Sequence, residues 1–160
     1  MYNAAEIFQI GIEIEKNGKK FYKLAAEKTD DEDSRKLFLE LADWEQGHVV
    51  LFENLKSDLA KQEGNTNMLD PDEEVERYLK ASADTHVFNI NADMDSLVNS
   101  CNTPQDILNL ALRFEKDSVV VYTAMKDRVV ESMGKEKVNK LINEEMLHVA
   151  FITKQLEILG

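Results

Sequence analysis

Apolar residues recur at helical spacing through the first 60 or so positions of the chain, in two stretches. The first stretch begins at Asn3, which together with Glu6 resembles a capping box, and it ends near Thr29. The second begins within residues 31–33 and fades near Gly64. The apolar positions are Ile7, Ile10, Ile14, Phe21 and Leu24 in the first stretch, and Leu37, Leu41, Phe52 and Leu55 in the second. Because the connection between them is short, the pattern predicts an antiparallel helical hairpin.

The last third of the chain repeats this arrangement. A third helix is expected to start at Thr103-Pro104, since proline is favoured in the first turn of a helix, and to run to about Val130. Gly134 suits a helix end in the left-handed conformation. A fourth helix is expected over residues 135–159, which predicts a second antiparallel hairpin.

A crossover over residues 64–103 joins the two hairpins. Asp70-Pro71 predicts the start of one short helix, which continues to about Ala83. Two hairpins joined by a crossover of about 40 residues are typical of the ferritin-like bundle topology. The sequence therefore predicts an all-α, ferritin-like four-helix bundle that forms a single domain over residues 1–160.

Both hairpins carry the same polar pattern at a constant offset of 100 positions. Glu15, Tyr22, Glu45 and His48 in the first correspond to Glu115, Tyr122, Glu145 and His148 in the second. A glutamate and a histidine three residues apart project from the same face of a helix. Neighbouring residues indicate which glutamates point inward: Glu145 lies among apolar positions, whereas Glu144 lies beside Lys140. The repeat therefore predicts a polar cluster inside the bundle.

The chemistry of this cluster suits a pair of metal ions. Two Glu-x-x-His pairs and two further glutamates provide six ligands, a set of carboxylates and imidazoles that favours iron or manganese. Four carboxylates would balance two divalent cations, whereas four unpaired carboxylates in a core would be very costly. We therefore predict two bound iron ions, with manganese or zinc as alternative occupants. The predicted ligands are Glu15, Glu45, His48, Glu115, Glu145 and His148.

Composition excludes several other classes of protein. The net charge is −12 and no cluster of Lys and Arg is visible, which argues against a nucleic-acid partner. Cys101 is the single cysteine, so an internal disulfide and a CxxC-based metal site are both excluded. No signal peptide and no apolar run of about 20 residues is present, so we expect a cytoplasmic protein without a membrane span.

Four segments resemble the ligand helices of the rubrerythrin-like branch of the ferritin-like di-iron carboxylate proteins. These segments are residues 15–22, 45–48, 113–118 (followed by Tyr122) and 145–148. The resemblance implies that Glu45 and Glu145 bridge two metal ions. It also implies that Glu15 and His48 complete one ion and that Glu115 and His148 complete the other. A homodimer is expected on the same ground.

The resemblance implies an oxidoreductase that reduces peroxide or oxygen with two electrons from a buried di-iron site. Two alternatives stay open: a ferroxidase or iron-handling protein that takes Fe(II) as substrate, and a metal-binding bundle without enzymatic activity. Ser118 stands where that family usually has an additional carboxylate, and we expect no rubredoxin module because residues 1–160 lack its cysteines. Electrons would then come from a separate donor, such as a rubredoxin-like protein, or from substrate iron.

Residues near the predicted cluster have less specific interpretations. Tyr22 and Tyr122 could orient the glutamates by hydrogen bonds, or simply pack in the core. His86, in the crossover, is expected at a helix end or on the surface. Trp44 is expected to serve packing or a subunit contact rather than electron transfer.

Overall fold

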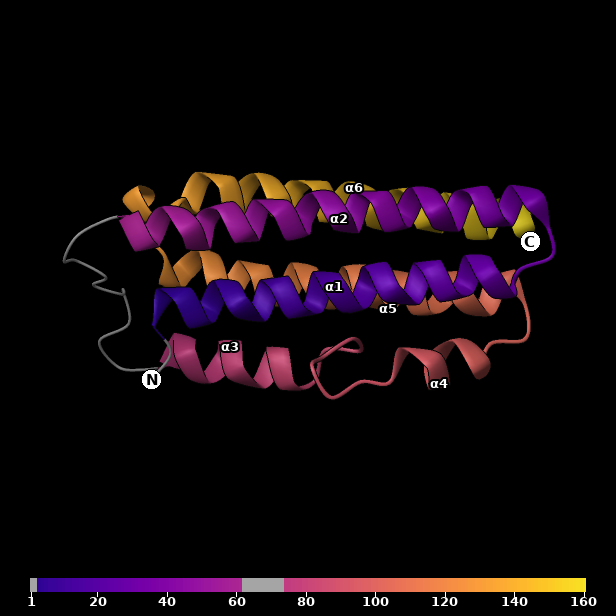
Figure 1. The fold of residues 1–160 in the computed structure, drawn as a ribbon, viewed down its shortest axis with the longest axis horizontal. Coiled ribbons are helices and arrows are strands. Elements are labelled where there is room, and N and C mark those ends of the chain that lie inside the picture. The colour runs from indigo at the N-terminus through magenta and orange to yellow at the C-terminus, as the bar shows by residue number, and fades with distance from the viewer. Residues whose placement is uncertain (1–2, 62–73) are drawn as a thin grey trace.

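Four long helices lie side by side in a computed structural model that describes residues 3–61 and 74–160 (Figure 1). They are α1 (Ala4–Lys28), α2 (Glu32–Lys61), α5 (Pro104–Arg128) and α6 (Lys135–Leu159). Helices α1 and α2 form one hairpin; α5 and α6 form the other, with the 3-10 turn η1 (Glu131–Met133) between them. The predicted all-α bundle of two hairpins joined by a long crossover is therefore confirmed.

The helix ends follow the capping signals of the sequence. The Asn3 side chain accepts a hydrogen bond from the backbone N–H of Glu6, and the Glu6 carboxylate accepts one from the backbone N–H of Asn3. Thr103 starts α5 with a capping box of the same kind, in which Asp106 is its partner. Gly134 adopts the predicted left-handed conformation, with φ of 97°. The expected helix start at Asp70-Pro71 lies outside the described residues.

In the described part of the crossover, residues 74–103, the structure has two short helices, where one was predicted. Helix α3 (Glu74–Asp84) packs on α5, and α4 (Met94–Asn99) packs on α1, on the side of the bundle away from α2 and α6 (Figure 1). Asn17 of α1 holds the segment between them, because its amide donates hydrogen bonds to the carbonyls of Phe88 and Asn89, at 3.1 and 2.9 Å. Residues 74–103 of the crossover thus cover one face of the bundle instead of extending into solvent.

Two glycines on α1 allow bulky rings to approach the helix backbone. A Cβ atom at Gly11 would lie 2.6 Å from the ring of Phe52, and one at Gly18 would lie 2.7 Å from the ring of Phe114. Both phenylalanines are fully buried. The close contact between α1 and its neighbours therefore depends on glycine, which has no side chain, at these two positions.

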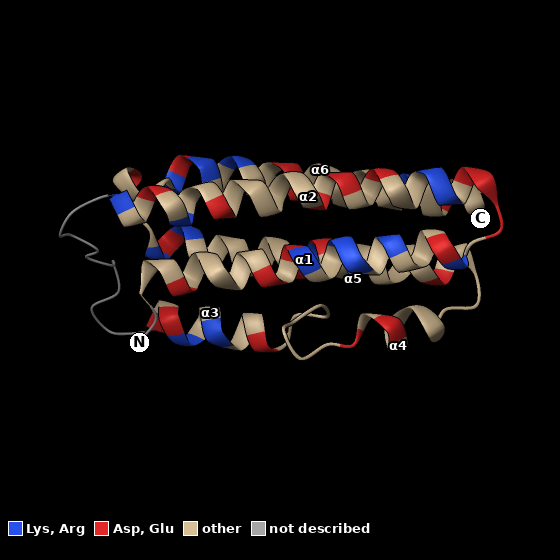
Figure 2. Ribbon diagram, in the orientation of Figure 1, with Lys and Arg blue, Asp and Glu red and all other residues tan. Residues whose placement is uncertain are grey.

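Charged residues of both signs are distributed along the long helices (Figure 2). In the part of the chain that the structure describes, every helix is too short or too polar to cross a membrane.

Candidate metal centre

The structure brings all six predicted ligands together inside the bundle. Each of the four long helices contributes: α1 and α5 provide one glutamate each, and α2 and α6 provide one Glu-x-x-His pair each. The residues are Glu15, Glu45, His48, Glu115, Glu145 and His148. All four glutamates are 0% exposed. Inward-facing positions on four helices therefore bring the four glutamates to one buried point, as the repeat predicts. The role of the six residues as metal ligands stays a prediction.

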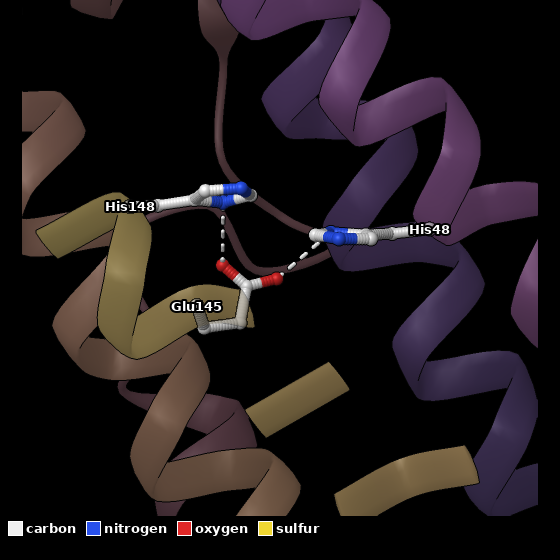
Figure 3. A group of neighbouring side chains, drawn as sticks. All are labelled: His48, Glu145 and His148. Atoms are coloured by element: carbon white, nitrogen blue, oxygen red, sulfur yellow. Dashed lines mark ion pairs between the residues drawn. The ribbon is translucent and has the colours of Figure 1, made fainter. Parts of the chain in front are cut away.

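Glu145 lies between the two histidines (Figure 3). One of its oxygens, Oε1, is 2.9 Å from Nδ1 of His48, and the other, Oε2, is 3.5 Å from Nδ1 of His148. The two imidazole rings are nearly parallel, with centroids 5.5 Å apart. If metal ions were bound, Glu145 would lie near both of them, because each of its oxygens faces one imidazole.

The other carboxylates divide between the two histidines. Nδ1 of His48 lies 3.5 Å from Glu15 Oε2 and 4.0 Å from Glu45 Oε2. Nδ1 of His148 lies 3.6 Å from Glu115 Oε2. Besides the group of His48, Glu145 and His148, two groups of potential ligand atoms lie within 4.8 Å of one another. Glu15, Glu45, His48 and Glu145 form one, and Glu45, Glu115 and His148 form the other. Glu45 belongs to both groups, so it too is placed to bridge.

Most polar atoms of the cluster are buried without a hydrogen-bond partner. Among the described residues these are Glu15 Oε2, both carboxylate oxygens of Glu45, Glu115 and Glu145, and Nδ1 of both His48 and His148. Unsatisfied buried groups are rare in folded proteins, and so many at one point need an explanation. Two divalent cations would satisfy these atoms and balance the charge of the four carboxylates. The donor set therefore fits a two-metal site.

Burial and mutual repulsion change the protonation of the cluster. Burial raises the pKa of Glu45 and of Glu115 well above 4.5, and the charges of neighbouring glutamates raise both further. Burial lowers the pKa of His48, but interactions with Glu145 and Glu15 outweigh it and raise that pKa to about 11. The metal-free cluster therefore holds protons that incoming metal ions would displace.

Two residues outside the ligand set contact it directly. The Tyr122 hydroxyl donates a hydrogen bond to Glu15 Oε1 at 2.5 Å, which joins the two hairpins. Glu144 lies 3.0 Å from Nε2 of His48. Such contacts orient ligands and tune their basicity. For Tyr122, the sequence indicated that its hydroxyl could orient a glutamate, but not that this glutamate lies in the other hairpin. For Glu144 it suggested no role. The Glu144 side chain is largely exposed, as its neighbour Lys140 indicated.

A match to known proteins accompanies this geometry. Residues 6–95 match the model of the family described as Rubrerythrin, which covers more than half of the chain. The chain belongs to the rubrerythrin family. No curated protein is significantly similar to it in sequence. A crystal structure of a candidate ferritin-like diiron-carboxylate protein from Thermotoga maritima shares its fold, with a TM-score of 0.73 and 24% identity over 99% of this chain and 97% of that one.

Together, rubrerythrin-family membership and the buried carboxylate–histidine cluster support a di-iron type of protein. The family match spans α1 and α2 and therefore includes Glu15, Glu45 and His48. The remaining three residues of the cluster follow from the internal repeat and from the structure.

His86 was expected at a helix end or on the surface. The surface position is wrong, because His86 is buried; the helix-end position is correct, because His86 follows the end of α3. Its Nδ1 accepts a hydrogen bond from the backbone N–H of Phe88, and its Nε2 lies 3.0 Å from the Ser118 hydroxyl. Burial lowers the pKa of His86 to about 3, so the ring is neutral and Nε2 carries the proton. The sequence did contain one indication of this contact: Ser118 lies one turn after Glu115 and faces inward, so its hydroxyl needs a polar partner inside the protein.

A surface pocket of about 590 Å³ lies over the two histidines of the cluster. Helices α2 and α6 form its walls. Its lining includes Trp44, Gly47, His48, Leu141, Glu144 and His148. The pocket gives small molecules a route from solvent to the histidine side of the cluster.

Proposed function

We propose that this rubrerythrin-family chain is a di-iron oxidoreductase that reduces peroxide or oxygen. The observation that supports it is the convergence of six buried ligand residues, most of whose polar atoms have no other partner among the described residues. The family membership favours iron over other divalent ions.

The chain's own residues have separable tasks in this proposal. The four glutamates and two histidines would hold the ions, with Glu45 and Glu145 between them. Tyr122 holds Glu15 in place, and Glu144 holds His48. The apolar core around the cluster excludes bulk water, and the pocket over the histidines admits a small oxidant.

Bound ferrous iron would supply the two electrons of the reaction. Reduction of one hydrogen peroxide consumes two electrons and two protons, breaks the O–O bond and yields two waters. A separate electron donor, such as a rubredoxin-like protein, would then have to replace the two electrons. The two protons would come from solvent through the pocket over the histidines.

The test is rapid mixing of the Fe(II)-loaded protein with peroxide and, separately, with oxygen. We expect oxidation of two irons per chain, with peroxide consumed in equal number to chains. The Glu45→Ala, Glu145→Ala double variant should lose both metal ions, whereas Glu40→Gln, an exposed change on α2, should keep them. Failure of both oxidants to reoxidise the iron would rule out the proposed reaction.

Ser118 favours a second candidate, a ferroxidase or iron-handling protein. Its hydroxyl is bonded to His86, so this position supplies no additional carboxylate to the cluster. In that case Fe(II) is the substrate, and ferric ions leave the site after oxidation. Oxidation of many Fe(II) ions per chain under excess Fe(II) would support this candidate; oxidation that stops at two would support the oxidoreductase. Metal retention without any oxidation would indicate a non-enzymatic bundle.

A further inference from the structure

The internal repeat is broken at a pair of positions whose side chains contact the histidines of the metal centre. Trp44 and Glu144 are separated by the same 100 positions as the repeated ligands, and each directly precedes a bridging glutamate. Both side chains reach across to the histidine of the other hairpin. Glu144 contacts His48, and Trp44 contacts His148. A carboxylate on one side thus corresponds to an indole on the other.

Glu144 strengthens His48 as a ligand. Nδ1 of His48 faces the buried carboxylates, so its Nε2–H points outward and donates to the Glu144 carboxylate at 3.0 Å. A carboxylate in this place fixes the tautomer and makes the imidazole more basic, and its loss typically lowers metal affinity by about 10- to 100-fold. Because the Glu144 side chain is 58% exposed, water weakens the effect, and we expect the lower end of that range.

Trp44 gives His148 no comparable support. Its ring stacks on the imidazole, with centroids 4.3 Å apart and planes 13° apart. The stack restricts the orientation of the ring, but an indole face is a poor substitute for a carboxylate as acceptor of the Nε2–H. Among the described residues, no side chain is within hydrogen-bond distance of His148 Nε2.

The two tyrosines are unequal in the same direction. Tyr122 donates its hydroxyl hydrogen to Glu15, the carboxylate that belongs with His48. Its counterpart Tyr22 is buried, and its hydroxyl has no hydrogen-bond partner among the described residues. Glu115, the carboxylate that belongs with His148, therefore lacks the support that Glu15 has.

From these two differences we infer that the metal positions are not equivalent. The position held by Glu15 and His48 binds its ion more tightly and fills first; the position held by Glu115 and His148 binds more weakly and exchanges its ion. This inference rests on the proposed metal centre. It concerns the order and strength of binding, which can be measured without any turnover.

Calorimetric titration of the metal-free protein with Mn²⁺ tests the inference. Repulsion between two ions also separates the binding steps, so each position is isolated in a single-site background. His148→Ala retains the Glu15–His48 position, and His48→Ala retains the Glu115–His148 position. In the His148→Ala background, Glu144→Gln should lower Mn²⁺ affinity about tenfold, and Tyr122→Phe should lower it as well.

The reverse change provides a gain of affinity that a misfolded variant would not show. In the His48→Ala background, Trp44→Glu places a carboxylate next to His148 and should raise Mn²⁺ affinity about tenfold. Trp44→Phe and Glu144→Gln are the controls and should leave it within about twofold. Circular dichroism would verify the helical fold of each variant.

The outcomes separate the two proposals. Binding of fewer than two Mn²⁺ ions by the wild-type chain overturns the metal centre and the inference with it. Binding of two ions, with Glu144→Gln and Trp44→Glu each without effect in its own background, overturns the inequivalence and leaves the metal centre standing.

Discussion

Replacement of Glu45 by glutamine should stabilise the metal-free protein while it abolishes normal metal binding. Glu45 is fully buried, and neither of its carboxylate oxygens has a hydrogen-bond partner among the described residues. Burial, followed by the charges of Glu15 and Glu115, raises its pKa well above 4.5. Without metal, the folded protein must keep this group protonated or tolerate a buried charge. Glutamine has nearly the same shape and no such penalty.

The magnitude follows from the difference in proton binding between the folded and unfolded states. In the unfolded chain the carboxyl group loses its proton near pH 4.5, whereas the folded chain retains it to higher pH. Each pH unit in this interval costs the folded state about 1.4 kcal/mol, so the cost at pH 7 is up to about 3.5 kcal/mol. For a chain of 160 residues, 1 kcal/mol corresponds to about 3 °C in Tm, so Glu45→Gln should raise Tm by up to about 10 °C.

Thermal unfolding followed by circular dichroism, after dialysis against a chelator, measures this difference between pH 4.5 and 8. The gain in Tm of the variant over the wild type should be near zero at pH 4.5 and should grow as the pH rises. The reason is that the wild type loses stability once the pH exceeds the pKa that Glu45 has in the unfolded chain. Glu40→Gln on the exposed side of α2 is the matched control and should change Tm little. With excess Mn²⁺ the order should reverse, since metal stabilises the wild type alone. A destabilised metal-free Glu45→Gln, or a gain independent of pH, would refute the reasoning.

Three further predictions concern protons, the turn before α6 and the crossover. Mn²⁺ binding at pH 7 should release about one to three protons per chain, because the pKa of His48 is raised to about 11 and burial raises the pKa of Glu45 and of Glu115. Calorimetry in buffers of different ionisation enthalpy counts these protons, and zero release would contradict the pKa shifts. Gly134→Ala should lower the free energy of unfolding by about 2 kcal/mol, because φ is 97° and the new Cβ would lie 2.3 Å from Leu55. Gly47→Ala is the control: this glycine lies in open space on a helix, so alanine should raise the free energy of unfolding by up to about 1 kcal/mol. Urea unfolding of both variants measures the two changes. His86→Gln should remove a loss of stability that the wild type shows as pH falls from 6.5, about 1.4 kcal/mol per unit, since the folded-state pKa of His86 is lowered to about 3; equal pH slopes for variant and wild type would refute this.

Much of the fold could be predicted from the sequence because helix formation and capping are local. The spacing of apolar residues defined four long helices, and the capping signals at Asn3 and Thr103 placed two of their starts correctly. Gly134 ended its turn in the predicted conformation because few other residues adopt a positive φ without strain. The six residues of the buried cluster could be found for a related reason: the repeat, together with inward-facing positions on each helix, selects Glu145 over Glu144 without knowledge of how the helices pack.

Contacts between distant segments were decided by the tertiary structure alone. Sequence spacing placed Tyr122 on the helix of Glu115, but its hydroxyl bonds to Glu15 in the other hairpin. Glu144 was recognised as outward-facing, yet its side chain is long enough to reach His48 at the rim of the pocket. His86 is buried because the crossover folds back over α5. A helix's own periodicity specifies which way a side chain points, whereas the residue that it meets depends on the rotation and separation of a neighbouring helix, which is set by the packing of the whole core.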